Sequence, residues 1–378
     1  MINIFEYFTK DDIFEKLARI DKNIILLFFI LFCIGLAMLY STGGGNIRPW
    51  ALKQTIYFVA LFPVTIFIAI TPINLLFKFS TFFYFAGVAL LVFVEVKGHR
   101  AMGAQRWINL GLFKLQPSEI MKMCLILQLG KYFFMLNADE IKSTKKLIKP
   151  IIYAAIPILL ILKQPNLGTA LILSAITIGI FFLVGVQVWK FVLCFVVVLC
   201  LVPVAWNYGM KDYQKQRVMT FLNPEEDPLN TGYNIIQSKI AIGSGGVWGK
   251  GFVNGTQTQL EFLPEKHTDF IFTVLSEEFG FIGALFVILL YLAIFTWCIF
   301  ITTRCAHTFG RVIASGILIN LFCHFFINIG MISGILPVVG TPLPFMSYGG
   351  SITAATLISL GFLLNVDLNK NEEIKLII

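Results

Sequence analysis

Charged residues are scarce in this sequence of 378 residues. Lysine, arginine, aspartate and glutamate together make up 13% of the chain, about half of the roughly 25% that is usual in soluble domains. So few charges cannot cover a surface that faces water, which excludes a soluble enzyme, a disordered chain and a fibrous repeat. The net charge of +8 gives no reason to expect a nucleic-acid partner, because most of the lysines and arginines flank apolar runs.

The sequence patterns of several enzyme classes are also missing. None of the seven cysteines lies between residues 207 and 268, the longest polar stretch, and no spacing of cysteine and histidine is typical of a metal site. The residues before Lys250 lack the first glycine of a phosphate-binding loop, since Ser244 stands at that position. No arrangement of serine, histidine and aspartate indicates a hydrolase triad.

Ten apolar runs dominate the chain, and each is close to the roughly 20 residues that a membrane-spanning helix needs. They predict an all-α, polytopic membrane protein, a single integral membrane domain over residues 1–378 with ten transmembrane helices. The predicted spans are 23–41, 50–70, 73–95, 117–136, 148–164, 166–186, 189–206, 270–302, 311–331 and 347–366.

The basic residues of the short loops predict the orientation. With the N-terminus inside, these loops place fourteen lysines and arginines inside and six outside, which favours a cytoplasmic location for both termini. The stretch before the first span is mixed in charge and lacks the basic region and the cleavage site of a secretory signal, so we expect this span to stay in the membrane as an anchor. Residues 207–268 then form one large extracytoplasmic loop between spans 7 and 8.

Two kinds of polar residue lie within the predicted spans, where ionisable groups are costly and usually functional. Glu119 and Lys122 are three residues apart on one helix face, so they are expected to form an ion pair, either purely structural or lining a polar cavity. Asn320, His324 and Asn328 recur at intervals of four, which predicts a polar stripe that hydrogen-bonds to neighbouring elements.

The long loop ends in the sequence LPEKHTDFIF, which brings His267 and Asp269 to the membrane edge as span 8 begins. An acid at this position stabilises the first turn of a helix. It is also well placed for chemistry at the membrane surface. Both interpretations stay open on the residues alone.

Five segments, taken together, resemble the SEDS family (shape, elongation, division and sporulation), and its rod-elongation branch more than its division branch. They are GAQRWINLGLFKLQPSEIMK (103–122), KQPNLGTAL (163–171), RVMTFLNPEEDPLNTGYNIIQSKIAIGSGGVWGKG (217–251), GTQTQLEFLPEKHTDFIF (255–272) and NIGMISGILPVVGTPLPFMSYGGS (328–351). They occur in the order expected of the family and cover most of the chain.

The resemblance implies a peptidoglycan glycosyltransferase of the bacterial inner membrane with ten spans, the same number as counted above. Such enzymes polymerise lipid II into β-1,4-linked glycan strands outside the membrane, beside a class B penicillin-binding protein and the elongation machinery. The family's essential acid corresponds to Asp269. One position departs from the family, because Asn166 stands where an aspartate is usual, so we do not count it as catalytic.

Lipid II carries its sugar through an α linkage, so forming a β linkage inverts the anomeric carbon and one direct displacement suffices. This step needs a base for the acceptor hydroxyl, which we expect to be Asp269. It also needs cations or N–H groups for the departing pyrophosphate. Substrate-binding candidates are Arg217, Lys239, Lys250, Arg106 and His267. No cofactor is expected with certainty, and a divalent cation stays open.

Two other functions fit the same sequence. A flippase for lipid-linked sugars would also have polar groups within spans and interrupted helices, but transporters concentrate them near the midplane. Here they gather at one end of the spans and in one loop. A scaffold that only activates a penicillin-binding protein could use the same loop as its interface.

Overall fold

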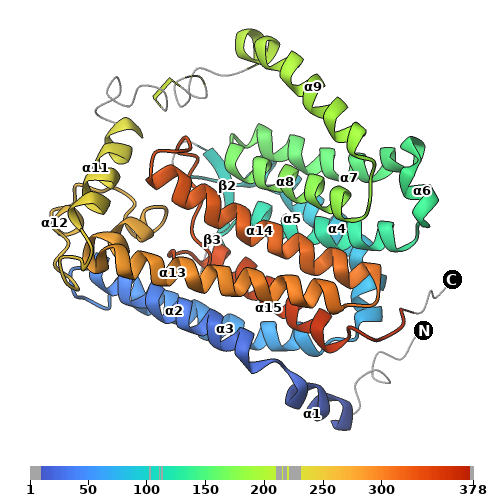
Figure 1. Cartoon of the computed structure of the whole chain (residues 1–378), viewed down its shortest axis with the longest axis horizontal. Helices are drawn as coiled ribbons and strands as arrows, with labels where there is room; N and C mark the ends of the chain where they lie inside the picture. The colour runs from blue at the N-terminus through green and yellow to red at the C-terminus, as the bar shows by residue number, and fades with distance from the viewer. Residues whose placement is uncertain are drawn as a thin grey trace.

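The computed structural model describes residues 10–101, 104–109, 111, 114–209, 215, 219–220 and 231–374. Helices make up most of this part of the chain (Figure 1). The helices are α1 (Lys10–Arg19), α2 (Lys22–Thr42), α3 (Ala51–Ile70), α4 (Ile73–Lys97), α5 (Pro117–Phe134), α6 (Ala138–Lys142), α7 (Thr144–Lys163), α8 (Leu167–Leu183), α9 (Val188–Val204), the π-helix η2 (Ala205–Gly209), α11 (Thr231–Ser244), α12 (Thr256–Gln259), α13 (Ile271–Arg304), α14 (Thr308–Ile332) and α15 (Gly350–Leu368).

Each of the ten predicted spans coincides with one of these helices. Six of them, α2, α3, α4, α13, α14 and α15, are long and apolar enough to cross a membrane, and α8 and α9 are shorter apolar helices. The prediction of a mostly helical, multi-pass membrane protein is therefore confirmed. The exact number of spans stays a prediction.

The all-α prediction is wrong in one detail. Between α4 and α5 the chain forms a three-stranded antiparallel sheet, made of β1 (His99–Ala101), β2 (Ala104–Asn109) and β3 (Lys114–Leu115). This connection carries charged residues such as Arg100, Arg106 and Lys114, which do not suit a membrane helix, and its backbone groups pair across hairpins instead.

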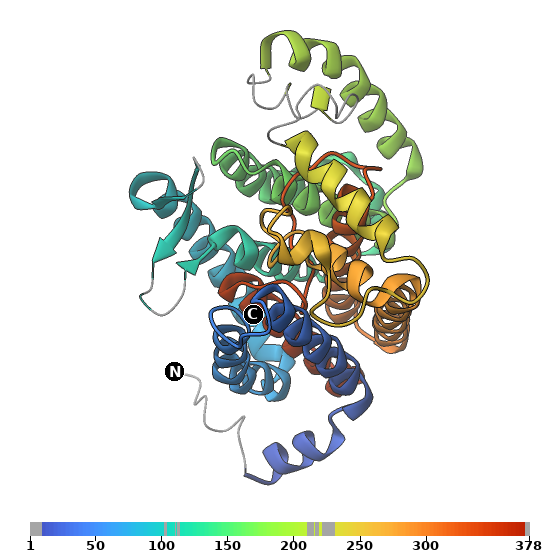
Figure 2. The ribbon, with the colours of Figure 1, turned by 90° about the vertical axis from the view of Figure 1, so that its left-hand side faces the viewer.

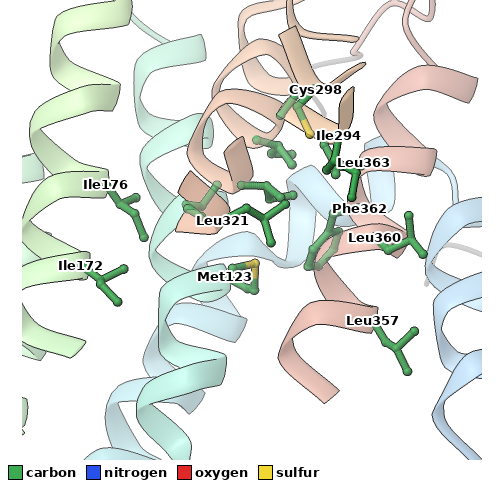
Figure 3. Close-up of a cluster of buried hydrophobic side chains, with 14 of the residues drawn as sticks. Met123, Ile172, Ile176, Ile294, Cys298, Leu321, Leu357, Leu360, Phe362 and Leu363 are labelled. Atoms are coloured by element: carbon green, nitrogen blue, oxygen red, sulfur yellow. The ribbon is translucent and has the colours of Figure 1, made fainter. Parts of the chain in front are cut away.

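The helices differ in how much of their surface faces other helices. In the most apolar stretch of α15, 83% of the residues are buried, against 17% in α3. The helix α15 therefore lies inside the bundle, while α3 lies at its periphery and packs one side against α15. In the core, apolar side chains of α15 lie in one cluster with those of α5, α8, α13 and α14 (Figure 3). The helix α9 stands away from the bundle in both ribbon views (Figures 1 and 2), and residues 192–203 are all exposed.

The long helix α13 is interrupted at Gly280, whose φ of 63° and ψ of −158° are not helical. The break leaves backbone groups of α13 without partners in their own helix. The glycine-rich segment 245–251 provides these partners through four hydrogen bonds of 2.9 to 3.2 Å. The N–H groups of Lys250 and Gly251 donate to the carbonyls of Glu277 and Glu278, and those of Phe281 and Ile282 donate to the carbonyls of Gly246 and Val247. The segment after α11 is thereby fixed to the first turns of α13.

Candidate functional site

Asp269 lies in a series of turns just before α13, at the end of the bundle where α11 and α12 also lie (Figure 1). Its side chain is half-buried, and Phe270, which follows it, is buried. The loop between α14 and α15, residues 333–349, packs against the same turns. Two loops far apart in the sequence therefore build the surroundings of the acid.

The main chain of residues 267–269 is held by three hydrogen bonds, one to each consecutive carbonyl oxygen. The donors are the backbone N–H of Tyr348 at 2.9 Å, the hydroxyl of Ser347 at 2.6 Å and the side-chain amide of Asn328 at 2.8 Å. We call these three donors the acid cradle. Because they bind the backbone, they fix the position of Asp269 without using its carboxylate.

The acid cradle is itself tied to the loop that follows α14. The amide of Asn328 also donates to the carbonyl of Thr341 at 2.7 Å, and the Ser347 hydroxyl accepts the N–H of Leu343 at 2.8 Å. The predicted polar stripe of α14 is used here, since Asn328 is its last member. The backbone conformation of the acid-bearing turn therefore depends on one loop and one helix.

The ion pair expected within α5 lies behind this loop. Lys122 Nζ is 2.9 Å from Glu119 Oε2 and 2.6 Å from His324 Nε2, and all three side chains are buried. His324 Nδ1 lies 3.1 Å from the carbonyl oxygen of Pro342. Since a carbonyl only accepts, Nδ1 carries the proton and Nε2 accepts from the ammonium. A continuous set of polar contacts thus runs from α5 through α14 to the loop of the acid cradle.

The carboxylate of Asp269 has an unusual environment. Burial raises its pKa from 3.8 to about 7, and the nearby carboxylate of Glu265 adds to this shift. Gly340, with a φ of 72°, lies directly against the acid, since a Cβ there would be 3.2 Å from Asp269 Oδ2. A carboxylate with a pKa near neutrality can accept a proton from a hydroxyl group and release it again.

His267 lies two residues before this acid and carries a neutral ring. Its imidazole stacks on the indole of Trp50, with the ring centroids 3.8 Å apart and the planes at 14°. Burial lowers the pKa of His267, so the ring is uncharged at neutral pH and can donate or accept a hydrogen bond. The structure therefore brings two of the predicted site residues, His267 and Asp269, into one turn.

The predicted cationic residues lie in different settings. Lys250 Nζ is 2.8 Å from Glu277 Oε1 and 2.6 Å from Thr256 Oγ1. The side chain of Lys239, on α11, lies over Gly334 just after α14, and Lys239 is exposed. Arg217 lies outside the described residues.

Arg106, on β2, donates from Nε to the carbonyl of Gln164 at 2.8 Å and from Nη2 to the carbonyl of Pro165. Asn166 follows directly and caps α8, because its side-chain oxygen accepts the N–H of Thr169 at 3.5 Å. At this position the residue that departs from the family hydrogen-bonds to the backbone of its own helix. It therefore serves the helix end.

Sequence reasoning missed Ser347 and Tyr348 as contacts of the turn that carries the acid, and Glu277 as the partner of Lys250. Ser347 and Tyr348 lie in the segment PLPFMSYGGS, whose polar residues interrupt an apolar stretch just before α15. That interruption was the available signal. It carries no information on the hydrogen-bond partner of Ser347, which is Thr268, 79 residues away along the chain.

Residues 21–372 match the family model described as "Cell cycle protein", which covers FtsW, RodA and SpoVE. The chain belongs to this family. The resemblance to SEDS proteins seen in the sequence is thereby confirmed.

Individual relatives agree with this assignment. The chain is 40% identical to the peptidoglycan glycosyltransferase MrdB of Escherichia coli (strain K12) over 351 residues, which are 92% of this chain and 94% of that protein. It is 32% identical to the peptidoglycan glycosyltransferase RodA of Treponema pallidum, over 92% of this chain and 97% of that protein.

Solved structures of relatives have the same fold. A chain from a peptidoglycan synthase complex that coordinates polymerization and crosslinking superposes with a TM-score of 0.81 at 27% identity, over 94% of this chain and 99% of that chain. The rod shape determining protein RodA of Thermus thermophilus gives a TM-score of 0.71 at 24% identity, with the same coverage.

Proposed function

We propose that the protein is a peptidoglycan glycosyltransferase that polymerises lipid II into β-1,4-linked glycan strands for cell-wall elongation and rod shape. The observation that carries this proposal is Asp269, an acid of raised pKa held by the acid cradle. It lies in the segment that matches the family's essential one. Membership of a family whose relatives are named peptidoglycan glycosyltransferases supports the same activity.

The proposed reaction is a single inverting displacement. The acceptor hydroxyl attacks the anomeric carbon of the donor, a glycosidic C–O bond forms, and the bond between that carbon and undecaprenyl pyrophosphate breaks. The hydroxyl proton passes to the Asp269 carboxylate, and the bonding electrons leave with the pyrophosphate. No covalent sugar–enzyme intermediate is needed, because one inversion converts an α into a β linkage.

The departing pyrophosphate needs positive charge or N–H donors. We propose that Lys239 and Arg217 supply it, with Lys250 and Arg106 at the edge of the same site, and that His267 binds substrate through its neutral ring. The exposure of Lys239 supports its access to a lipid headgroup. A divalent cation could assist at the pyrophosphate. Among the described residues, no three histidine, cysteine or acidic side chains are grouped to hold one.

The proposed placement is the bacterial inner membrane. One integral domain, residues 1–378, would cross it ten times with both termini in the cytoplasm. Residues 207–268 would then form the extracytoplasmic loop that approaches lipid II. The excess of basic residues in the loops on the cytoplasmic side supports this orientation.

We further propose that a class B penicillin-binding protein, as part of the elongation machinery, packs its single span on α13 and α14. Both helices carry rows of exposed apolar side chains, which are Phe281, Leu285, Phe286, Leu289 and Leu292 on α13 and Phe322 and Phe326 on α14. The likeness to a chain from a peptidoglycan synthase complex supports such a partner.

The decisive experiment follows chain growth on a gel after the purified protein and its partner are incubated with lipid II. Asp269→Asn keeps the shape of the side chain but removes its basicity, so polymerisation is expected to fall by at least about a hundredfold. Abundance and partner binding should stay normal, because the acid cradle binds only the main chain. Asp269→Glu should restore activity in part, since it moves the carboxylate by about one bond length.

The same assay separates the alternative functions. A flippase, or an activator without catalysis of its own, predicts no glycan chains from the purified protein and no specific effect of Asp269→Asn. A well-folded Asp269→Asn variant that polymerises at the wild-type rate would place the base elsewhere.

A further inference from the structure

A cavity of about 250 Å³ lies at the opposite end of the bundle from Asp269, where α2 begins and where α13 and α15 end. It is independent of the proposed active site. Its lining combines charged and aromatic side chains, which are Asp21, Trp297, Phe300, Arg304, Asp367 and Lys370.

The position of these residues along their helices sets the depth of the cavity in a membrane. Asp21 directly precedes α2, Arg304 is the last residue of α13, and Asp367 lies in the last turn of α15. All three helices are long and apolar enough to cross a membrane. The cavity therefore lies where spans leave the hydrocarbon, at the level of lipid headgroups. Phe300 and Trp297 lie about one and two turns further in, as aromatic residues do at membrane interfaces.

The charges in the cavity are only partly paired. Lys370 Nζ binds Asp367 Oδ1 at 3.1 Å. Asp21 accepts the N–H of Asn23 at 2.8 Å, and the Arg304 guanidinium lies 5.4 Å from the centre of the Phe300 ring. Among the described residues, neither Asp21 nor Arg304 has a salt-bridge partner, so the two are also not paired with each other. The cavity thus holds an acid and a base that one ligand could bridge.

We propose that this cavity binds the headgroup of a zwitterionic phospholipid that carries a primary ammonium. The phosphate would bind the Arg304 guanidinium, whose fork of donors matches phosphate oxygens. The ammonium would bind Asp21, since –NH₃⁺ donates up to three hydrogen bonds to carboxylates. The start of the acyl chains would lie along Trp297 and Phe300.

The chemistry of the two charges selects among lipid headgroups. A choline headgroup has a cation without N–H donors, so it cannot hydrogen-bond to Asp21. A glycerol headgroup has the phosphate for Arg304, but it offers Asp21 only neutral hydroxyl donors, whose hydrogen bonds are weaker than those of a cation. The ethanolamine headgroup is the one of the three that gives Asp21 a charge-assisted hydrogen bond and Arg304 a phosphate.

The test titrates the purified full chain in detergent with phosphatidylethanolamine, phosphatidylcholine and phosphatidylglycerol of identical acyl chains, and counts bound lipid by native mass spectrometry. The ethanolamine lipid is expected to bind at least about tenfold more tightly than the other two, as one charge-assisted hydrogen bond allows. Asp21→Asn should abolish its advantage over the glycerol lipid. Arg304→Gln should weaken the binding of the ethanolamine lipid and of the glycerol lipid to a similar extent.

The matched control uses an acid and a base outside the cavity. Asp139 and Lys142 on α6 form an exposed pair at 3.1 Å, so Asp139→Asn and Lys142→Gln should leave lipid preference unchanged. Equal binding of the three lipids by the wild-type protein would overturn the proposal, and this measurement does not depend on whether a variant folds. An unchanged lipid preference in Asp21→Asn would also overturn it. So would a photoreactive residue at position 300 that crosslinks to protein and not to lipid.

Discussion

Asp269 owes its raised pKa to burial and to a like charge, while its position comes from bonds to its main chain. These two causes are separable, because they involve different neighbours. Glu265 acts on the proton affinity of the carboxylate, and Asn328 acts on where the carboxylate stands. Substitutions at these two residues should therefore have different kinetic signatures.

The pH dependence of polymerisation tests the first cause. A base of pKa about 7 is protonated and inactive below that value, so kcat/KM should rise as the pH increases through 7. Glu265→Gln removes a negative charge that disfavours ionisation of Asp269, so the acid limb of the profile should move to lower pH. Glu261→Gln, at an exposed acid of the same loop, is the control and should leave the profile in place. An unshifted limb in Glu265→Gln would contradict the assignment of the base.

Asn328→Leu tests the second cause. The substitution keeps the size of the side chain but leaves the carbonyls of Asp269 and Thr341 without their donor, so the acid should lose its alignment. We expect kcat to fall by about tenfold or more, with an unchanged KM for lipid II and an unchanged pH limb. Asn320→Leu is the matched control on the same helix, since its buried side-chain oxygen has no partner among the described residues. Equal losses in both variants would mean that Asn328 acts only through stability.

At the scale of elements, apolar run length predicted a helix at every expected span, because a chain that crosses lipid must be apolar and must satisfy its backbone groups within the helix. The break in α13 was not predictable in this way. The sequence EEFGFIGALF continues an apolar pattern through Gly280, and its hydrogen-bond partners lie about 30 residues earlier. A backbone interaction between distant segments leaves no periodic signal.

A substitution at Gly249 tests whether segment 245–251 binds the break in α13. An added Cβ would overlap the carbonyl of Glu278 at a φ of 81°, and a Cβ on Gly246, at a φ of 55°, meets nothing within 4 Å. Both positions are left-handed, so both alanine variants lose about 1 kcal/mol to backbone strain, and Gly249→Ala also loses the fit to α13. In thermal unfolding of the purified protein, Gly249→Ala should therefore unfold at a clearly lower temperature than Gly246→Ala. Equal midpoints would show that segment 245–251 is not fixed to α13.

At the scale of the whole molecule, the sequence indicated the acid and its place at a helix start, but it did not indicate which loops surround it. His267 and Asp269 are close in sequence, so their proximity was predictable. The approach of residues 341–349 was not, since it depends on how α14 and α15 pack. Lys250 was predicted to bind substrate, and its pairing with Glu277 likewise appears only in the folded chain.

The proposed partner surface is tested by photoreactive residues placed along four helices. Crosslinkers at Phe286 on α13 and Phe322 on α14 should capture a class B penicillin-binding protein, because both side chains are exposed and apolar. Phe29 on α2 and Phe67 on α3 are equally exposed and serve as controls. Capture from these control positions alone would refute the arrangement.

The acid cradle has a genetic consequence. Because its three hydrogen bonds end on main-chain carbonyls, a chain without the Asp269 carboxylate keeps its shape and, on the proposed arrangement, its surface for the transpeptidase. Such an inactive copy would still occupy a partner in a cell that also carries a working gene. Alleles altered at this one side chain should therefore be dominant, with wall growth falling as the share of inactive copies rises, whereas alleles that unfold the bundle should be recessive.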